Sequence, residues 1–370
     1  MKVLFSGGGT LGPVTPLLAI HDVIKVAYPK AEYIWVGTPY GPERQLVEER
    51  GIPFRTIAAG KLRRYVSFIN LLDPMRFLIG FVQSLLLLRR ERPTFCISAG
   101  GYVSVPLHFA AWLLGIPTWV HQQDVRVGLS NRLMAMIAAI VTTALQTHAG
   151  SLPKDKTQWL GNPVRAEIAA GDLEYAREIF DLRDDLPVVL AMGGGTGSKR
   201  INDLVAEALP QLAALTNIIH VSGADRPQEV LQGLSAQYDT YRVYPFLMRE
   251  LKHAYAAADI VISRGGFGSL TEIAALQKPA IVIPKPGHQD ENVEFLASAG
   301  AVVLLDQRTA SGAELAGLIR ELLADNERRR QLGEKMGALL PRAEEKKILE
   351  ILARLCPTPP SVSASLGTRG

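Results

Sequence analysis

The sequence predicts an α/β protein built from two doubly wound parallel sheets, one in each half of the chain. Short runs of β-branched and apolar residues alternate with segments of helical periodicity, beginning with residues 2–6 and 16–27. This alternation is typical of parallel strands joined by crossover helices. A glycine-rich turn follows the first strand of each half, at 7–12 and again at 193–197. The length of 370 residues also suits roughly two domains.

Composition excludes several classes of protein. A hydrophobic fraction of 48% and a charged fraction of 21% indicate a folded chain with a core. The net charge of +4 is too small for a dedicated nucleic-acid binder, so we expect no nucleic-acid partner. Cys96 and Cys356 lack a metal-binding spacing, and Cys96 lies in an apolar run, so we expect a buried thiol and no metal. Two unpaired cysteines are typical of a reducing, cytosolic protein.

The first half predicts seven strands, taken in order along the chain. They are expected at residues 2–6, 32–36, 54–57, 95–98, 118–121, 141–145 and 157–159. Helices are expected at 16–27, 43–50, 76–90 and 130–140, and another follows Gly100-Gly101 with Ser104 as its cap. The three apolar residues before the first glycines are too few for a signal peptide. No window of 18 apolar residues occurs, so no membrane-spanning helix is predicted.

The second half repeats the pattern after a hinge at 161–165. Strands are expected at 187–191, 218–222, 241–243, 259–263, 280–284 and 301–304. Helices are expected at 173–180, 201–212, 248–257, 270–277, 314–323, 327–339 and 343–355. The two halves predict Rossmann-like domains, residues 1–162 and 163–340, that face each other across a cleft. We expect the terminal helix 341–356 to return to the first domain, and the Pro/Ser/Gly-rich tail 357–370 to be disordered.

Residues 259–292 carry the strongest functional signal. A strand is followed by a glycine turn, with Ser269 as the expected cap of a helix from Leu270. Bare N–H groups at such a turn suit a phosphate, and Glu272 on the first helical turn suits the two hydroxyls of a ribose. After the next strand we expect a polar loop with His288, Gln289, Asp290, Glu291 and Asn292. A glycine turn alone is more often a plain strand–helix connection, but the acid and the polar loop together indicate a nucleotide-sugar pocket.

Residues 61–92 interrupt the alternation. Seven basic and two acidic residues give this segment a net charge of +5, and apolar residues lie among the arginines. This mixture is typical of a helix at an anionic membrane surface. The alternative is a crossover helix at 76–90 that packs on the sheet and has a basic end. We expect both features: the helix at 76–90 packs mostly in the core, and residues 62–75 face the membrane.

A set of short motifs resembles one family along most of the chain, from residue 1 to about 355. The motifs are Gly9-Thr-Leu-Gly-Pro-Val-Thr-Pro16, Gly100-Gly-Tyr-Val-Ser104, His121-Gln-Gln-Asp124, Gly161-Asn-Pro-Val-Arg165, Gly193-Gly-Gly-Thr-Gly197, Ser263-Arg-Gly-Gly266, Thr271-Glu-Ile273 and Gln289-x-x-Asn292. Their order and spacing resemble the MurG family of peripheral membrane N-acetylglucosaminyltransferases of peptidoglycan synthesis.

The resemblance implies a GT-B fold and inverting transfer of a hexosyl group without metal or cofactor. The donor would be UDP-N-acetylglucosamine (UDP-GlcNAc). The acceptor would be the muramoyl-pentapeptide sugar on undecaprenyl pyrophosphate. Transfer would convert this acceptor, lipid I, into lipid II. The resemblance also implies a position at the cytoplasmic face of the membrane, through the basic segment 61–92, wall-synthesis proteins as partners, and roles in cell shape and division.

Site residues follow from the same resemblance. On the donor side Glu272 would hold the ribose, and Phe246 and Leu247 would flank the uracil. The remaining donor residues would meet the diphosphate or orient the sugar: Arg165, Gly194, Gly195, Thr196, Gly266, Phe267, Gln289 and Asn292. The residues expected to approach the acceptor are Thr10, Gly12, Gly101, Tyr102, Ser104 and Gln123.

The sequence departs from the family pattern on the acceptor side. Pro13 stands where the family has histidine, Gln122 where it has glutamate, and Asp124 where it has asparagine. On the donor side, Gly195 replaces a serine that many members carry. For the base that takes the acceptor proton we predict Asp124, with His121 as the alternative. Pro13 and Asp124 also keep open a different polyprenyl-linked or diacylglycerol acceptor, and a non-catalytic scaffold or a nucleotide-sugar epimerase remain as further alternatives.

Overall fold

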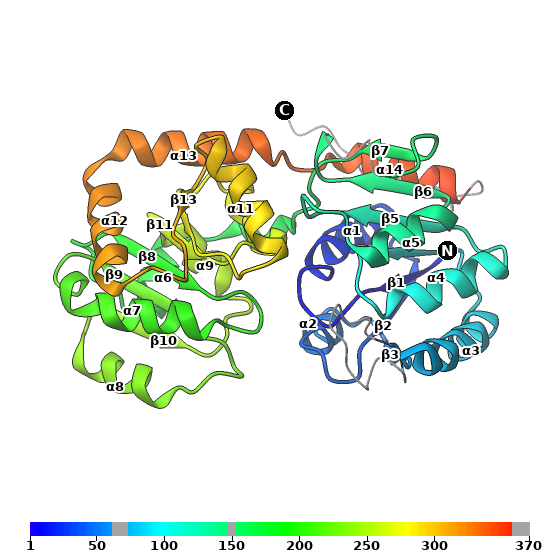
Figure 1. The fold of residues 1–370 in the computed structure, drawn as a ribbon, viewed down its shortest axis with the longest axis horizontal. Coiled ribbons are helices and arrows are strands. Elements are labelled where there is room, and N and C mark those ends of the chain that lie inside the picture. The colour runs from blue at the N-terminus through cyan, green and yellow to red at the C-terminus, as the bar shows by residue number, and fades with distance from the viewer. Residues whose placement is uncertain (61–72, 147–151, 357–370) are drawn as a thin grey trace. The chain divides into compact units, whose positions relative to one another are not determined.

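The computed structural model describes residues 1–60, 73–146 and 152–356, which form two compact units. Unit 1 is Met1–Arg165 together with the chain from Ala343, and unit 2 is Ala166–Arg342. Each unit holds one parallel sheet with helices on both faces, which confirms the predicted fold class (Figure 1). Most of the expected membrane-facing segment 62–75 and the tail 357–370 lie outside the described residues.

The sheet of unit 1 has the strand order β3-β2-β1-β4-β5-β6-β7. Its strands are β1 (Lys2–Ser6), β2 (Glu32–Gly37), β3 (Phe54–Thr56), β4 (Phe95–Ser98), β5 (Thr118–Gln122), β6 (Ile140–Thr143) and β7 (Thr157–Trp159). All neighbouring strands are parallel, and β1 pairs with both β2 and β4. The order reverses between β1 and β4, and ligands bind outside the carboxyl ends of strands at such a point.

Helices cover both faces of this sheet. They are α1 (Thr15–Ala27), α2 (Glu43–Glu48), α3 (Asp73–Glu91), α4 (Ser104–Leu113), α5 (Leu129–Ile137) and α14 (Glu345–Leu355). Because side chains alternate along a strand, Val3 and Phe5 pack with α1 and α14, whereas Leu4 packs against α3 and α4. The last helix of the chain therefore belongs to the core of unit 1.

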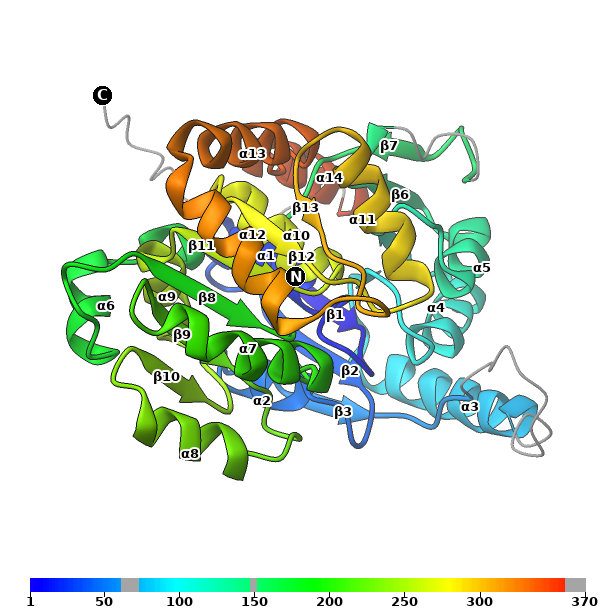
Figure 2. The same ribbon diagram turned by 60° about the vertical axis from the view of Figure 1, so that its left-hand side comes forward.

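The sheet of unit 2 has the order β10-β9-β8-β11-β12-β13. Its strands are β8 (Val188–Met192), β9 (Asn217–Val221), β10 (Tyr241–Tyr244), β11 (Ile260–Ser263), β12 (Ala280–Val282) and β13 (Val303–Leu304). Its helices are α6 (Leu173–Ile179), α7 (Lys199–Leu212), α8 (Glu229–Gln237), α9 (Leu251–Ala257), α10 (Phe267–Ala275), α11 (His288–Ser298), α12 (Gly312–Ala324) and α13 (Asn326–Leu339). Helices α7 and α12 pack side by side on one face (Figure 2). The order reverses between β8 and β11, next to the predicted pocket.

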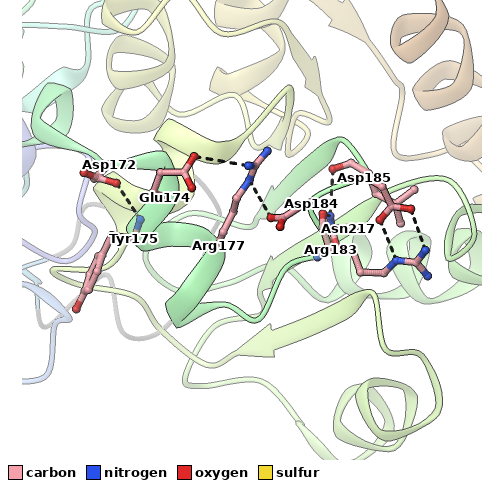
Figure 3. Close-up of polar contacts among 9 residues, drawn as sticks. Asp172, Glu174, Tyr175, Arg177, Arg183, Asp184, Asp185 and Asn217 are labelled. Atoms are coloured by element: carbon pink, nitrogen blue, oxygen red, sulfur yellow. Dashed lines mark hydrogen bonds and ion pairs between the residues drawn. The ribbon is translucent and has the colours of Figure 1, made fainter.

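Unit 2 begins with a short 3-10 helix, Ala166–Ala170, and α6. Asp172 caps α6 by accepting a hydrogen bond from the Tyr175 amide at 2.8 Å. Arg177 forms ion pairs with Glu174 and Asp184, while the Arg183 amide donates to Asn217 Oδ1 on β9 (Figure 3). These contacts stabilise the start of α6 and connect the turn that follows it to β9.

Three predictions about local structure were wrong, and one helix was missed. The expected polar loop at 288–292 is the start of α11, because Asp290 accepts a hydrogen bond from the Gly287 amide at 2.9 Å and caps the helix. Helix α8 was not predicted. Helix α10 begins at Phe267 with Gly266 at the capping position, so Ser269 is not the cap. Ser104 is also inside its helix, and its hydroxyl donates to the Gly100 carbonyl.

The prediction of a buried thiol at Cys96 is confirmed, since its side chain is fully buried and burial raises its pKa. Within the described ranges, no helix has the length and apolar character needed to cross a membrane.

Candidate active site

The turn after β8 is the first component of the site in unit 2. Gly194 and Gly197 have φ angles of 76° and 67°, which favour glycine. A Cβ atom at Gly197 would lie 2.3 Å from the Ser222 carbonyl oxygen, so this turn packs directly on the loop after β9. Ser198 ends the turn and caps α7, because its hydroxyl accepts from the Ile201 amide. The turn therefore presents backbone amides close to a helix N-terminus, an arrangement suited to an anion.

The turn after β11 is the second component, and α11 holds it in place. A Cβ atom at Gly265 would lie 2.5 Å from Val293 Cγ2, so only glycine lets α11 approach. Asn292 is fully buried and donates to the Gly265 carbonyl oxygen at 3.0 Å. Gln289 Nε2 would lie 3.7 Å from a Cβ atom at Gly266. The structure thus brings together three predicted donor residues, Gly266, Gln289 and Asn292.

Glu272 lies on α10, and its side chain is 4% exposed. The Tyr255 hydroxyl lies 3.4 Å from Glu272 Oε2 and 3.3 Å from Met192 Sδ. Met192 is the last residue of β8, directly before the glycine turn. Tyr255 therefore connects the predicted ribose acid with the predicted phosphate turn. Sequence reasoning missed Tyr255, because its position becomes informative only when α9 packs against β8 and α10 packs against β11.

The other predicted donor residues differ in exposure. Thr196 is exposed, whereas Gly194, Gly195 and Phe246 are half-buried. Leu247 and Phe267 are buried, at 6% and 2% exposure, so the Phe267 ring belongs to the core. Arg165 is buried and ends the first segment of unit 1, Met1–Arg165, so it lies outside the unit that carries the other donor residues.

Three arginines near the turn after β8 were not predicted as site residues. Arg264 Nη1 donates to the Ile283 carbonyl and to Gln307 Oε1, and Arg200 Nε donates to the Gln307 carbonyl at 2.9 Å. Arg226 Nη2 donates to the Gly197 carbonyl at 3.4 Å. Burial first, and then the charges of Arg226 and Arg200, lower the pKa of Arg264 to about 10. The sequence separates these three residues by up to 64 positions (264 minus 200), so no local pattern reveals the cluster.

In unit 1 the turn after β1 surrounds a buried carboxylate. Glu43 is fully buried and accepts hydrogen bonds from the Thr38 amide at 2.7 Å, the Thr38 hydroxyl at 2.6 Å and the Gly9 amide at 3.2 Å. Cβ atoms at Gly8 and Gly41 would lie 2.1 and 1.8 Å from its carboxylate oxygens. The Gly9 amide is therefore already bonded to a carboxylate. Glu43 was not predicted from the sequence as a site residue. Gly8 and Gly41 leave room for its carboxylate, but Gly8 meets it only in the fold.

The turn after β4 closes on the turn after β1. Gly101 has a φ angle of 95°, and a Cβ atom there would lie 3.0 Å from the Gly8 carbonyl oxygen. The Tyr102 ring lies 3.0 Å from the position of a Cβ atom at Gly9. The structure thus brings Gly101 and Tyr102 to the first glycine turn, where Thr10 is exposed and Gly12 half-buried. Ser104, in contrast, is fully buried and bonded within its own turn.

The two predicted bases lie at the end of β5. His121 is fully buried, with Nδ1 2.9 Å from the Thr142 hydroxyl, whereas Asp124 lies in the following loop and is half-buried. Gln122 shapes this loop: Nε2 donates to the carbonyl oxygens of Asp124 at 2.7 Å and Arg126 at 3.2 Å. Gln123 is buried, at 5% exposure. Of the two candidates, Asp124 has the better access to a substrate hydroxyl.

Within 1–60, 73–146 and 152–356, no three His, Cys, Asp or Glu side chains gather into a group able to hold a metal ion.

Two doubly wound units, each with a glycine turn where its strand order reverses, define a protein of the GT-B class. Comparison with protein families gives the same assignment. Residues 3–143 match the glycosyltransferase family 28 N-terminal domain, and residues 188–350 match the C-terminal domain of that family. The chain belongs to glycosyltransferase family 28, and the similarity to MurG predicted from the sequence is confirmed.

Curated relatives cover most of the chain. A Bacillus anthracis protein named UDP-N-acetylglucosamine--N-acetylmuramyl-(pentapeptide) pyrophosphoryl-undecaprenol N-acetylglucosamine transferase 2 is 34% identical over 88% of this chain and 92% of its own length. A Clostridium kluyveri transferase of the same name, without the number, is 36% identical over 80% of this chain and 83% of its own.

Solved structures with a similar fold support the same assignment. MurG of Acinetobacter baumannii has a TM-score of 0.70 at 26% identity and covers 95% of this chain and 99% of its own. The UDP-GlcNAc 2-epimerase of Neisseria meningitidis, bound to UDP-GlcNAc, has a TM-score of 0.65 at 16% identity, over 96% of this chain and 100% of its own. At that identity the epimerase shares the fold alone.

Proposed function

We propose that this protein transfers N-acetylglucosamine from UDP-GlcNAc to the muramoyl-pentapeptide sugar of an undecaprenyl-pyrophosphate lipid, the step from lipid I to lipid II in peptidoglycan synthesis. The observation that carries this proposal is the similarity of 34–36% identity over 80–88% of the chain to transferases named for that reaction. The contacts among Gly266, Gln289 and Asn292, and the link from Glu272 to β8, support a donor site in unit 2.

The chemistry is a single displacement with inversion. An acceptor hydroxyl oxygen attacks C1 of the donor sugar, the bond from C1 to the diphosphate oxygen breaks, and UDP leaves with the bonding electrons. The base takes the hydroxyl proton, and we assign this role to Asp124. Backbone amides at the turns after β8 and β11 stabilise the negative charge on UDP. With the proton taken by Asp124 and the charge of UDP stabilised by backbone amides, the reaction needs no resident cofactor.

Transfer of radiolabelled sugar from UDP-GlcNAc to the muramoyl-pentapeptide lipid, with and without detergent, tests the proposal. Product is expected with the wild-type protein and should fall at least about a hundredfold in kcat with Asp124→Asn, since general-base catalysis contributes on that order. Retained turnover and an unchanged pH profile in this variant would exclude Asp124 as the base. Binding of UDP-GlcNAc without any transfer would favour the scaffold alternative.

We also propose that unit 1 contacts an anionic membrane through α3. Among residues 75–91 of α3, only Gly80, Ser84 and Leu88 are buried, and a Cβ atom at Gly80 would lie 1.8 Å from the Ala58 carbonyl oxygen. Phe81, Leu85 and Leu87 are partly buried against the core, whereas other apolar side chains of the helix are exposed, among them Leu78 at 61% and Leu86 at 63%. Helix α4 lies beside α3 (Figure 1). It adds the exposed side chains of Trp112 and Leu113. Arg76, Arg89 and Arg90 on α3 supply positive charge.

Co-sedimentation with phosphatidylglycerol vesicles tests this contact. Leu78→Glu with Leu86→Glu should reduce the bound fraction strongly, because two charges replace two apolar anchors. Val230→Glu is the matched control, since Val230 is 72% exposed on α8 of unit 2. Equal vesicle binding by the wild type and both variants would exclude α3 as the contact.

A different lipid acceptor is the second candidate function. It is favoured by the departures at Pro13, Gln122 and Asp124, and by Glu43, whose carboxylate already accepts from the Gly9 amide. A carboxylate behind this turn repels a pyrophosphate placed against it. Measuring kcat/KM with the muramoyl lipid and with diacylglycerol as alternative acceptors distinguishes the two functions.

A further inference from the structure

Three guanidinium groups gather beside the turns after β8 and β11 in unit 2. Arg264 immediately precedes Gly265, and Arg226 donates to the carbonyl oxygen of Gly197 in the other turn. Arg200 and Arg264 meet at one residue, because both donate to Gln307. The cluster therefore lies between the two turns that present backbone amides.

The charge of this cluster is not balanced by protein carboxylates. Over the ranges 1–60, 73–146 and 152–356, none of the three arginines forms an ion pair. Their hydrogen-bond partners are backbone carbonyl oxygens and the neutral side-chain amide of Gln307. The charges are close enough to interact, since Arg226 and Arg200 both lower the pKa of Arg264 after the larger effect of burial. Like charges gathered in a half-buried place destabilise each other unless an anion joins them.

The cluster also keeps donor groups available. Both hydrogen bonds of Arg264 come from Nη1, which leaves Nε and Nη2 without a partner among the described residues. Arg226 Nε is buried and has no partner in that part of the chain either. Guanidinium groups bind phosphate oxygens through paired N–H donors, and they do so more tightly where water is partly excluded.

We propose that Arg200, Arg226 and Arg264 bind the diphosphate of the nucleotide donor and make the site select nucleoside diphosphates over monophosphates. This inference rests on the proposed donor site and assigns its diphosphate-recognising side chains. The alternative is that the arginines only anchor loops through their carbonyl partners, in which case nucleotide charge would not matter to them.

Calorimetric titration of the full chain with uridine, UMP and UDP, without lipid acceptor, tests the assignment. Arg226→Gln should weaken UDP binding by roughly tenfold, the effect of losing one hydrogen bond to a charged group, and leave uridine binding unchanged. Arg226 is the preferred position because its single protein bond, at 3.4 Å, is long. Arg320→Gln is the matched control, an exposed arginine on α12, and should bind all three ligands like the wild type.

Parallel weakening of UDP and uridine, or unchanged UDP binding, would overturn the assignment. The wild type offers a second test that needs no variant: its affinity for UDP should fall with added salt more steeply than its affinity for uridine. A salt response equal for both ligands counts against the cluster. A wild type that binds no UDP would instead overturn the proposed donor site, so the two failures are distinguishable.

The pyrophosphate of the lipid acceptor has the same chemistry as the diphosphate of the donor. The KM values for the two substrates show which of these groups the arginines bind. In Arg226→Gln the KM for UDP-GlcNAc should rise while the KM for the lipid stays constant. A rise confined to the lipid KM would assign the cluster to the acceptor and contradict the proposal.

Discussion

The glycine turns after β1 and after β8 occupy the same place in two similar sheets, yet their surroundings have opposite charge. Behind the turn of unit 1 lies the buried carboxylate of Glu43, which already accepts a hydrogen bond from the Gly9 amide. Beside the turn of unit 2 lie Arg200, Arg226 and Arg264, which have no carboxylate partner among the described residues. Topology therefore determines where a ligand can bind, whereas the side chains behind each turn determine the charge that it can carry.

The largest effect is expected from the turn after β8 itself. Gly197→Ala places a Cβ atom 2.3 Å from the Ser222 carbonyl oxygen at a φ of 67°, so unfolding free energy should fall by about 3 kcal/mol. Gly194→Ala is the control: its φ is 76°, but no atom lies within 4 Å of the new Cβ, so about 1 kcal/mol is expected. Urea denaturation measures both, and equal losses would show that steric contact with the loop after β9 is unimportant.

The carboxylate behind the first turn gives the next effect. Glu43→Ala leaves the buried Thr38 amide and the half-buried Gly9 amide without an acceptor, which should cost about 3 kcal/mol of unfolding free energy. Loosening this turn should also raise the KM for the lipid acceptor and leave the KM for UDP-GlcNAc unchanged, because the glycine turns of the proposed donor site lie in unit 2. Denaturation and steady-state kinetics check the two parts. A rise in the donor KM alone would contradict the division of roles between the turns.

The sequence predicted the fold well where local composition decides it. The strands Lys2–Ser6, Phe95–Ser98 and Thr157–Trp159 have the expected bounds, because short apolar runs between turns leave few alternatives. Helix α11 was not predicted because its first turn is charged and polar, which is also typical of a loop, whereas in the fold Asp290 caps the helix. Its residues Gln289 and Asn292 were nevertheless predicted as site residues.

Other parts of the site depend on tertiary packing and have no local signal. Glu43 meets Gly9 across 34 positions, and Tyr255 reaches Glu272 and Met192 only because α9 and α10 are neighbours of β8 and β11. The exposure of a side chain also depends on tertiary packing. His121 and Ser104 have suitable chemistry in the sequence, but the fold buries both completely. Side-chain chemistry can be identified in a sequence, whereas access to it follows from the packed layers.

A buried histidine in each unit extends the comparison to pH. Burial lowers the pKa of His108 in unit 1 and of His220 in unit 2 to about 3. Each is neutral in the folded state but takes up a proton on unfolding below a pH of about 6.5, so stability is lost as pH falls from there towards 3. His108→Leu should remove the contribution of unit 1 to this loss. Between neutral pH and about pH 5, the unfolding free energy of the variant should therefore fall by roughly 2 kcal/mol less than that of the wild type.

The two histidines should respond differently to replacement at neutral pH. Both ring nitrogens of His220 are bonded, to Tyr241 at 2.7 Å and Asn202 at 3.1 Å, whereas His108 contacts Ser6 through Nε2 at 3.2 Å. His220→Leu should therefore cost more, because two buried polar partners are left without a bond. Unfolding free energies of both variants across the pH range measure this, and identical acid slopes for wild type and His108→Leu would refute the role of His108.

The smallest effect is expected at Gln122, on the acceptor side of the comparison. Its Nε2 donates to the carbonyl oxygens of Asp124 and Arg126, while its Oε1 accepts from Asn131 at 2.7 Å. Gln122→Glu replaces the donor by an oxygen that faces two carbonyl oxygens, so we expect a loss of about 2 kcal/mol at neutral pH. Burial should raise the pKa of the new carboxyl group, and its protonation restores one donor, so the loss should shrink as pH falls. Denaturation at several pH values measures this trend. A loss that stays constant with pH would mean that the loop carrying Asp124 does not depend on these two bonds.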